Sequence, residues 1–521
     1  MNAAGQRVAR AALLLMFTVA ISRILGYGRE VALYSLFGQN YITDAYRAAF
    51  SVPDFLYLLL VGGALSSAFI PVFTSCLVTG REDQGWKSAS IVFNYTLIGL
   101  ILLLILAYFY TLPLVTLLAP GLPQQYLSLA VNLTHIMFLQ TVFMSLNGFA
   151  MGVLNSYHNF TAPAVGSLIY NLVIILAGVL LVDKLGIAAF SYGVVLGAAL
   201  NFAVQIPALR RIGIKYRFSL DYRDKGFQQI MLLMLPVLAG LGVIQLNLFV
   251  TQNISSTLGA GTISALNLAQ KIMNLPIGIF ASSIAIAIFP TLTALAAREE
   301  MEQFKQTASL GLRAIFLVSI PASLGLIALA EPLVKLLFEQ KEFTAAMTGT
   351  TSQVLKYYCL GLFAYSAIQV LNRSFYALKD SKTPMIAAAI TIAVNILLSW
   401  HLSGLYQHQG LALAYALAGI VNLILLGVIL RIKTGKIGGR QIVSSLLVAV
   451  AASLLMYVAV RCSLSWLLAI LHLADKLNLL LGTGMAVLVG IVVYSLIIYP
   501  FKLEETQMLL KILRRKLPGR C

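Results

Sequence analysis

The stretch Ala68-Phe69-Ile70-Pro71-Val72-Phe73-Thr74 decides the fold, because a similar stretch follows much later in the chain. The second stretch is Ala287-Ile288-Phe289-Pro290-Thr291-Leu292-Thr293, in register at the proline (290 − 71 = 219). Two further proline pairs keep nearly this spacing, Pro113 with Pro332 (offset 219) and Pro163 with Pro384 (offset 221). Self-similarity at a nearly constant offset indicates an internal repeat, so the chain is predicted to fold as two related halves.

The composition is that of an integral membrane protein. Of the 521 residues, 60% are hydrophobic and only 10% are charged, whereas soluble domains contain about 25% charged residues. A helix needs about 20 mostly apolar residues to cross a bilayer. Fourteen such spans are predicted, at residues 9–36, 44–75, 88–112, 126–156, 161–182, 185–209, 227–256, 263–297, 306–331, 348–378, 383–403, 409–431, 441–461 and 478–501.

The repeat and the spans together predict an all-α polytopic fold. The offset shifts the chain by six helices, and an even shift preserves orientation, so the two halves are predicted to be parallel six-helix lobes around a central cavity. The predicted regions are an N-lobe with a basic linker (1–222), a C-lobe (223–435), and two extra helices with a basic C-terminal tail (436–521).

Charge distribution predicts the orientation in the membrane. The formal net charge is +18, and most basic residues occur in alternate loops, as the positive-inside rule predicts when both termini are cytoplasmic. The chain has no basic stripe with interleaved aromatic residues, so nucleic-acid binding is not predicted. The first apolar run is predicted to remain as a helix rather than to be cleaved as a signal peptide.

Signatures of catalysis, metal binding and disulfide pairing are not found in the sequence. The four cysteines are scattered, so neither a zinc site nor a disulfide framework is indicated. No catalytic or phosphate-loop motif occurs, and His135 stands alone in a predicted span, where packing is the more common role. We therefore expect a protein that is not an enzyme and that uses no cofactor or metal.

The most unusual local feature is Ser22-Arg23-Ile24-Leu25-Gly26-Tyr27-Gly28-Arg29-Glu30, which places three charged residues in the first predicted span. A charge at the bilayer centre costs about 2.5–3.5 kcal/mol and usually faces protein or a water-filled path. Arginine suits phosphate because its planar guanidinium donates paired, charge-assisted hydrogen bonds. Arg23 and Arg29 are therefore predicted to bind a phosphate-bearing substrate. The alternative is that Arg29 and Glu30 extend to the outer interface.

Two other groups of charged residues are candidates for the same cavity. Asp44, Arg47 and Asp54 in the second span suggest a gate, in which carboxylates pair with arginines in one conformation and release them in another. Asp44 could alternatively be a helix N-cap, and Arg47 lies three residues on, within reach of Asp44. Lys271, shortly before Pro276, is a second candidate phosphate contact. The alternative is that the side chain of Lys271 extends along the helix and places its ammonium group at the membrane interface.

The sequence resembles the MurJ/MviN lipid II flippases of the MOP exporter superfamily over most of its length. The residues that carry the resemblance are Ser22-Arg23-Ile24-Leu25-Gly26, Arg29-Glu30, Leu36-Phe37-Gly38, Thr43-Asp44-Ala45, Ala49-Phe50, Val52-Pro53, the stretch from Gly63 to Pro71, Leu118-Ala119-Pro120-Gly121 and Thr383-Pro384.

The resemblance implies a function and a set of site residues. It implies translocation of an undecaprenyl-diphosphate-linked peptidoglycan precursor from the cytoplasmic to the outer leaflet of the bacterial cytoplasmic membrane by alternating access, by a protein that functions as a monomer. It places the family's arginines at Arg23 and Arg29, its aspartate at Asp44, and a lysine, Lys271, where the family has an arginine. Helices 13 and 14 would form a groove for the lipid tail.

Two departures leave other substrates open. Tyr57 stands where the family often has a basic residue, and Gly62 where it has an acidic one. A flippase for another polyprenyl-diphosphate-linked glycan is one alternative. A drug or cation antiporter of the same superfamily would favour acidic residues in the cavity, and a membrane-embedded transferase would need an acidic metal-binding motif.

Overall fold

The computed structural model describes residues 3–61, 64–470, 475–501 and 504–506, and it is helical over nearly all of them. Within these ranges there are no β-strands. Gly62 and Gly63 lie outside the described residues, as do Lys502, Cys521 and the basic residues of the predicted C-terminal tail, Lys511, Arg514, Arg515, Lys516 and Arg520.

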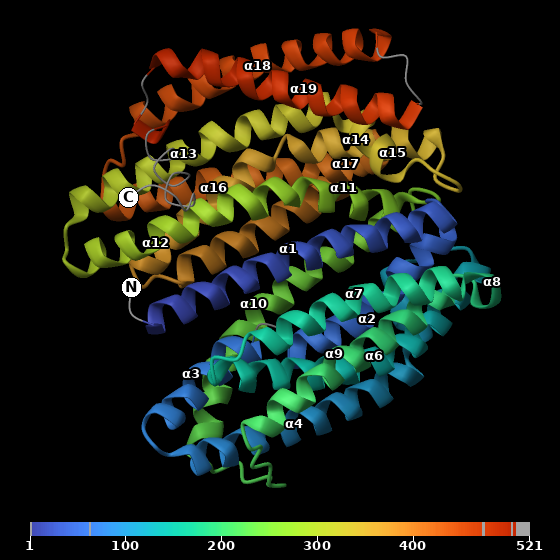
Figure 1. Cartoon of the computed structure of the whole chain (residues 1–521), viewed down its shortest axis with the longest axis vertical. Coiled ribbons are helices and arrows are strands. Elements are labelled where there is room, and N and C mark those ends of the chain that lie inside the picture. Colours follow the sequence, from blue (N-terminus) through green and yellow to red (C-terminus); the bar gives the residue numbers. More distant parts are fainter. Residues whose placement is uncertain (1–2, 62–63, 471–474, 502–503, 507–521) are drawn as a thin grey trace. The chain divides into compact units, whose positions relative to one another are not determined.

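The chain divides into two compact units, and the first comprises Met1–Ser264 together with Gln340–Phe343. Its helices, labelled in Figure 1 except for α5, are α1 (Ala3–Phe37), α2 (Tyr41–Leu60), α3 (Ala64–Val78), α4 (Glu82–Phe109), α5 (Thr111–Leu118), α6 (Gln124–Ser156), α7 (Thr161–Leu180), α8 (Val182–Leu185), α9 (Ala188–Arg211) and α10 (Lys225–Ser256). The first three residues of α11 (Thr262–Pro276) also belong to this unit.

The second unit comprises Ala265–Glu339 and Thr344–Cys521. It contains the rest of α11, a π-helical turn (Ile277–Ala281), α12 (Ser282–Ala297), α13 (Met301–Ala328), α14 (Ala330–Phe338), α15 (Ala345–Cys359), α16 (Leu362–Ala377), α17 (Lys382–Thr434), α18 (Gly439–Ile470), α19 (Asp475–Ile498) and a 3-10 turn (Tyr499–Phe501). The predicted lobe boundaries at residues 222 and 435 remain predictions about the repeat.

Helices occupy all fourteen predicted segments, but the count of fourteen membrane spans is not confirmed. Among the residues that the structure describes, 10 helices are long and apolar enough to cross a membrane, or up to 11 if the bent pair α15 and α16 (43°) forms one span. One cause is α17, which counts as one helix of 53 residues although it consists of two helices that meet at a kink at the non-helical residue Gln407 (φ 51°), between the two spans that the sequence predicts. Another is that the second predicted span consists of two shorter helices, α2 and α3.

The internal repeat is visible in the helix bounds. Helices α4 and α13 both have 28 residues, and their first residues are 219 apart (301 − 82 = 219). Each is followed by a short helix, α5 or α14, of which only the first two residues fall within the preceding predicted span. Pro113 and Pro332 stand at the third residue of these short helices. Proline is tolerated in the first turn because the N–H groups there have no partner within the helix.

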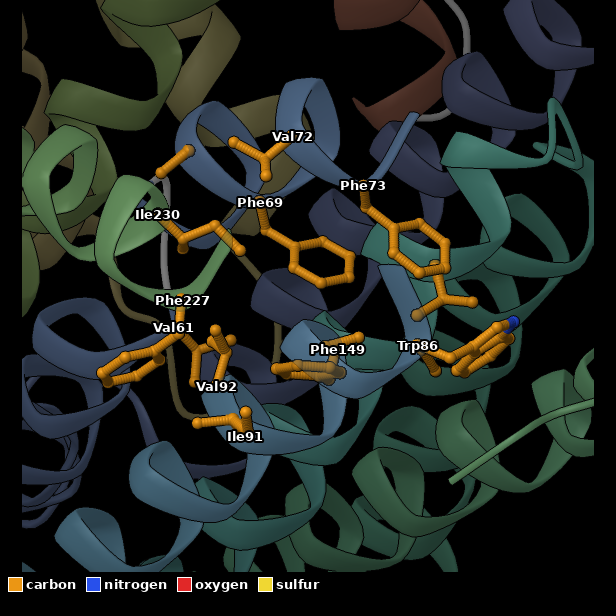
Figure 2. Close-up of a cluster of buried hydrophobic side chains, with 14 of the residues drawn as sticks. Val61, Phe69, Val72, Phe73, Trp86, Ile91, Val92, Phe149, Phe227 and Ile230 are labelled. Atoms are coloured by element: carbon orange, nitrogen blue, oxygen red, sulfur yellow. The ribbon is translucent and has the colours of Figure 1, made fainter. Parts of the chain in front are cut away.

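The stretch that marks the repeat lies in the core of the first unit. Phe69 and Phe73 of α3 are fully buried, and their rings stack with centroids 5.1 Å apart. Phe73 meets Trp86 of α4 edge-on at 5.4 Å, and Phe149 of α6 lies against Phe69 at 5.2 Å. Figure 2 shows these rings gathered with Val72 and other apolar side chains from α3, α4, α6 and α10. Burial of each such aromatic ring removes a large apolar area from water or lipid and fixes how the helices pack.

The basic linker after α9 runs along α4. Lys215 of the linker lies 2.9 Å from a carboxylate oxygen of Asp83, and Lys87 of α4 lies 2.9 Å from Asp221. The side-chain amide of Asn94 donates to the carbonyl of Ser219 at 2.9 Å. The linker therefore has a defined path in the first unit, although it has no regular secondary structure.

Candidate functional site

The connection between α1 and α2 places the first charged residues. Gly38 ends α1 with a positive φ of 64°, a conformation that glycine adopts without strain. Asn40 then caps α2, because its side chain accepts from the N–H groups of Ile42 and Thr43, and Thr43 completes a capping box. This tight reversal brings the last turns of α1 beside the first turns of α2.

Glu30 and Arg47 face each other across this reversal. Glu30 lies seven residues before the end of α1 and Arg47 six residues after the start of α2, so each is about 10 Å from the connection at about 1.5 Å per residue. Arg47 forms an ion pair with one carboxylate oxygen of Glu30, and Arg29 pairs with the other oxygen at 3.2 Å. Glu30 is only 2% exposed. We call Arg29, Glu30 and Arg47 the α1–α2 cluster.

Two tyrosines complete the surroundings of Arg47. Its guanidinium carbon lies 5.5 Å from the ring centroid of Tyr34 and 5.9 Å from that of Tyr46, within the range of cation–π attraction. Its Nε also donates to the Tyr34 hydroxyl at 3.3 Å. Arg47 is therefore held by a carboxylate, a hydroxyl and two ring faces.

Asp44 binds the start of α11 and does not cap its own helix. One carboxylate oxygen accepts from the backbone N–H and the hydroxyl of Ser264 at 2.9 and 2.7 Å, and the other accepts from the N–H of Gly261 at 2.7 Å. The N-cap alternative for Asp44 is thus wrong, because Asn40 has that role. The predicted proximity of Arg47 to Asp44 does not produce an ion pair, since Arg47 pairs with Glu30.

The other three predicted site residues are Arg23, Asp54 and Lys271. Arg23 is exposed, and its neighbour Ser22 contacts Ser167 and Asn171 of α7. Asp54 is exposed on α2. Lys271 is half-buried on α11 in the second unit, one turn before Pro276 and the π-helical turn. The structure brings together Arg29, Glu30, Asp44 and Arg47, and the part played by Arg23, Asp54 and Lys271 stays a prediction.

Sequence reasoning missed Tyr34 and Ser264, which join Asp44 to the cluster. Tyr34 is four residues after Glu30 and therefore lies on the same face of α1, a signal that was available. The hydroxyl of Tyr34 donates to the carbonyl oxygen of Ser264 at 3.3 Å. Ser264 could not be found from local spacing, because it is 220 residues from Asp44.

The charge balance of the α1–α2 cluster suits an anion. Two guanidinium groups share one carboxylate, so the cluster carries a net charge of +1. A guanidinium has five N–H donors, and one carboxylate cannot occupy ten of them. Arg29 retains 23% exposure of its side chain. A phosphate or diphosphate could therefore form paired hydrogen bonds here. No group of three or more histidines, cysteines or carboxylates that could hold a metal occurs in the described parts of the chain.

A second ionic cluster, in the second unit, was not predicted. Arg313 of α13 lies 3.1 Å from Glu505 and 3.0 Å from Glu504, both shortly after α19. Glu505 is fully buried and also accepts a hydrogen bond from Ser445 of α18. We call Arg313, Glu504 and Glu505 the Arg313 cluster.

Comparison with known proteins gives the family. A family model described as lipid II flippase MurJ matches residues 33–474. This chain belongs to the MurJ family of lipid II flippases. The probable lipid II flippase MurJ of Buchnera aphidicola is 30% identical over 428 residues, covering 81% of this chain and 82% of that protein. The lipid II flippase MurJ of Burkholderia cenocepacia is 30% identical over 414 residues, covering 78% of this chain and 80% of that protein.

Solved structures agree with this membership. A structure of lipid II flippase MurJ in an inward closed conformation matches with a TM-score of 0.79 at 28% identity, covering 94% of this chain and 99% of that one. A multidrug resistance transporter of the MATE family and the MOP superfamily matches with a TM-score of 0.66 at 14% identity, covering 81% of this chain and 98% of that one. The second likeness concerns the fold alone. This MurJ family member is thus a multi-pass membrane protein with the transporter fold of the MOP superfamily.

Proposed function

We propose that this chain translocates lipid II, the undecaprenyl-diphosphate-linked peptidoglycan precursor, from the cytoplasmic to the outer leaflet of a bacterial cytoplasmic membrane. The observation that carries the proposal is the α1–α2 cluster, in which buried Glu30 holds two arginines and leaves a net positive charge. Membership of the MurJ family supports the substrate class. The protein works as a monomeric transporter rather than an enzyme, without a cofactor and without nucleic acid.

The cluster binds the diphosphate by exchange of partners. A diphosphate cannot enter hydrocarbon without compensating hydrogen bonds, since burying an unpaired charge is very costly. Arg29 and Arg47 supply charge-assisted donors, and Glu30 holds them in place before the substrate arrives. Because Glu30 competes with the substrate for the same donors, it also weakens binding enough for the lipid to leave.

Asp44 closes one side of the path in this proposal. Its carboxylate accepts three hydrogen bonds at the start of α11, where helix N–H groups lack partners within the helix and the helix dipole favours a negative charge. Breaking these bonds would free the start of α11 from α2. Alternating access then consists of forming and breaking the Asp44 contacts while the diphosphate is held by the arginines.

The remaining predicted residues take supporting roles. Lys271 contributes a second phosphate contact, as a point charge without the bidentate geometry of arginine. Arg23 attracts the diphosphate along α1, and Asp54 pairs with a basic residue when the conformation changes. Both termini are cytoplasmic, as the basic loops indicate.

A vesicle assay tests the proposal. The purified protein is reconstituted with fluorescent lipid II, and the fraction that reaches the opposite leaflet is measured over time. Charge reversal by Arg29→Glu should reduce the rate at least about 100-fold, equivalent to about 2.7 kcal/mol. The matched control is Arg298→Glu, which reverses an exposed arginine at the end of α12 and should leave the rate unchanged. Unimpaired flipping by Arg29→Glu would contradict the proposal. If the unaltered protein binds a different diphosphate-linked glycan but does not bind lipid II, that other glycan would be favoured as the substrate.

A further inference from the structure

Tyr34 lies between the α1–α2 cluster and the start of α11. Its side chain is fully buried, with 0% exposure. The hydroxyl accepts from Arg47 Nε at 3.3 Å and donates to the Ser264 carbonyl at 3.3 Å. A tyrosine hydroxyl has one donor, and these two bonds use that donor and one acceptor position. A continuous chain of interactions therefore runs from Glu30 through Arg47, Tyr34 and Ser264 to Asp44.

The start of α11 is held closely in this unit. Gly261 has a positive φ of 78°, and a Cβ at this position would lie 2.6 Å from the carbonyl oxygen of Gln39, so the two backbones approach more closely than any other residue permits. Asp44 fixes the N–H groups of this segment, while Tyr34 fixes a carbonyl of the same segment. Tyr34 also accepts a hydrogen bond from Arg47 of the α1–α2 cluster.

The Tyr34 hydroxyl is polarised by the cation that donates to it. A hydroxyl that accepts from a charged group becomes a stronger donor, because hydrogen bonds in a chain strengthen one another. When Arg47 turns toward another anion, the Tyr34 hydroxyl loses this charged donor, and its bond to Ser264 weakens. The occupancy of the arginines is then coupled to the hold on α11.

We propose that Tyr34 is a positioning residue that couples diphosphate binding at Arg47 to release of the start of α11. The inference rests on the proposed function, since it assumes that a diphosphate engages the cluster. Two states with different contacts are needed for any such coupling. In the unbound state Arg47 holds Glu30 and Tyr34, and in the bound state Arg47 holds the diphosphate while Tyr34 releases Ser264.

Tyr34→Phe isolates the hydroxyl from the ring. Phenylalanine keeps the edge-on contact with Phe343, at 6.3 Å between centroids, and the face beneath the Arg47 guanidinium. The matched control is Tyr46→Phe, because Tyr46 is also buried beside Arg47. Within the described residues the Tyr46 hydroxyl makes no hydrogen bond to the start of α11, so its loss leaves the proposed coupling intact.

The test measures how accessible the start of α11 is. Thr262, which is 4% exposed, is replaced by cysteine after the four native cysteines have been changed to serine. Labelling by a polar maleimide is followed in detergent with and without inorganic pyrophosphate. In the otherwise unaltered protein, pyrophosphate should raise the labelling rate about 5-fold or more, within the usual range of coupling between sites. Tyr34→Phe should label rapidly without pyrophosphate and respond less than about 2-fold, whereas Tyr46→Phe should respond normally.

The outcomes separate this inference from the proposed function. Pyrophosphate binding is measured in parallel by calorimetry, with Arg29→Glu as the variant expected to lose it. If pyrophosphate binds and Tyr34→Phe keeps the full labelling response, the coupling role of Tyr34 is wrong and the proposed function stands. If pyrophosphate fails to bind the unaltered protein, both are overturned.

Discussion

In the α1–α2 cluster two arginines share Glu30, whereas in the second unit two glutamates share Arg313. Both clusters have a buried glutamate at their centre, Glu30 at 2% and Glu505 at 0% exposure. The first has a surplus of positive charge and the second a surplus of negative charge. The two clusters therefore differ in which groups outnumber their partners: the arginines in the first cluster and the glutamates in the second.

The two surpluses have different consequences. In the Arg313 cluster the extra anion, Glu504, has a side chain that is 78% exposed, so solvent can satisfy it. Buried Glu505 is bonded to both Arg313 and Ser445, which joins α13, α18 and the segment after α19. This cluster is therefore suited to hold helices together. The α1–α2 cluster keeps guanidinium donors that Glu30 does not occupy, and in the proposed function these donors bind an anion.

Arg47→Ala should have the largest effect on transport. It removes one of the two arginines of the cluster and leaves Glu30 to neutralise Arg29, so the surplus positive charge disappears. We expect lipid II flipping in vesicles to fall about 100-fold or more. The unfolding temperature in detergent should fall less for Arg47→Ala than for Arg313→Ala, because Glu30 keeps a cationic partner in Arg29. Flipping within a few fold of the unaltered rate would show that the surplus charge is not needed.

Arg313→Ala should have the largest effect on stability. Removing one partner of a buried ion pair typically costs about 3–5 kcal/mol, because the other charge is left uncompensated. Thermal unfolding, followed by the fluorescence of the tryptophans, should shift clearly to lower temperature. In a double-mutant cycle, Glu505→Gln in the Arg313→Ala background should recover much of the loss, since glutamine is neutral and can still bond Ser445. Equal, additive losses would mean that the pair contributes little.

Glu30→Gln should separate binding from turnover. The substitution removes the carboxylate that competes with the diphosphate and raises the net charge of the cluster from +1 to +2. We expect about 10-fold tighter binding of lipid II, equivalent to about 1.4 kcal/mol, with a lower maximal flipping rate because release is slower. Weaker binding together with a lower rate would instead assign Glu30 a purely structural role.

Breaking the surface ion pair of Asp380 and Lys433 should have the smallest effect on stability among these substitutions. Desolvation raises the pKa of Asp380, but hydrogen bonds from Lys433 and Thr383 outweigh it and lower the pKa to about 2. A carboxyl group whose pKa is lowered on folding stabilises the protein at pH values above its pKa in the unfolded chain, about 3.9. This contribution is lost as the pH falls toward 2. Asp380→Asn should therefore destabilise the protein by at most about 1 kcal/mol at pH 7. The difference from the unaltered chain should shrink in unfolding scans between pH 4 and pH 2, and a constant difference would contradict it.

Local chemistry explains which parts of the site could be predicted. The charges of Arg29 and Glu30 are conspicuous in an apolar span, and the proline spacing revealed the repeat that the bounds of α4 and α13 confirm. The partners of Asp44 could not be predicted from spacing, because its carboxylate accepts from N–H groups of residues 261 and 264, whereas Arg47, within reach on the same helix, pairs with Glu30. Such a contact depends on tertiary packing that spacing along one helix cannot show.

The Arg313 cluster illustrates the same limit. Arg313 lies in α13, nearly two hundred residues before Glu505, and nothing in the local sequence pairs them. The count of fourteen spans is not confirmed, for a related reason. Local hydropathy marks apolar segments, but it does not show that the helices before and after Gln407 meet at a kink or that α2 and α3 are separate helices.

The most direct test of the central claim compares two lipid anions. The affinities of the purified protein for undecaprenyl diphosphate and undecaprenyl monophosphate are measured in nanodiscs, for the unaltered chain and for Arg29→Ala. If the surplus positive charge of the α1–α2 cluster binds the diphosphate, the unaltered protein should prefer the diphosphate by about 10-fold or more, the worth of one charge-assisted hydrogen bond. Arg29→Ala should reduce this preference to less than about 3-fold. An undiminished preference in Arg29→Ala would contradict the account.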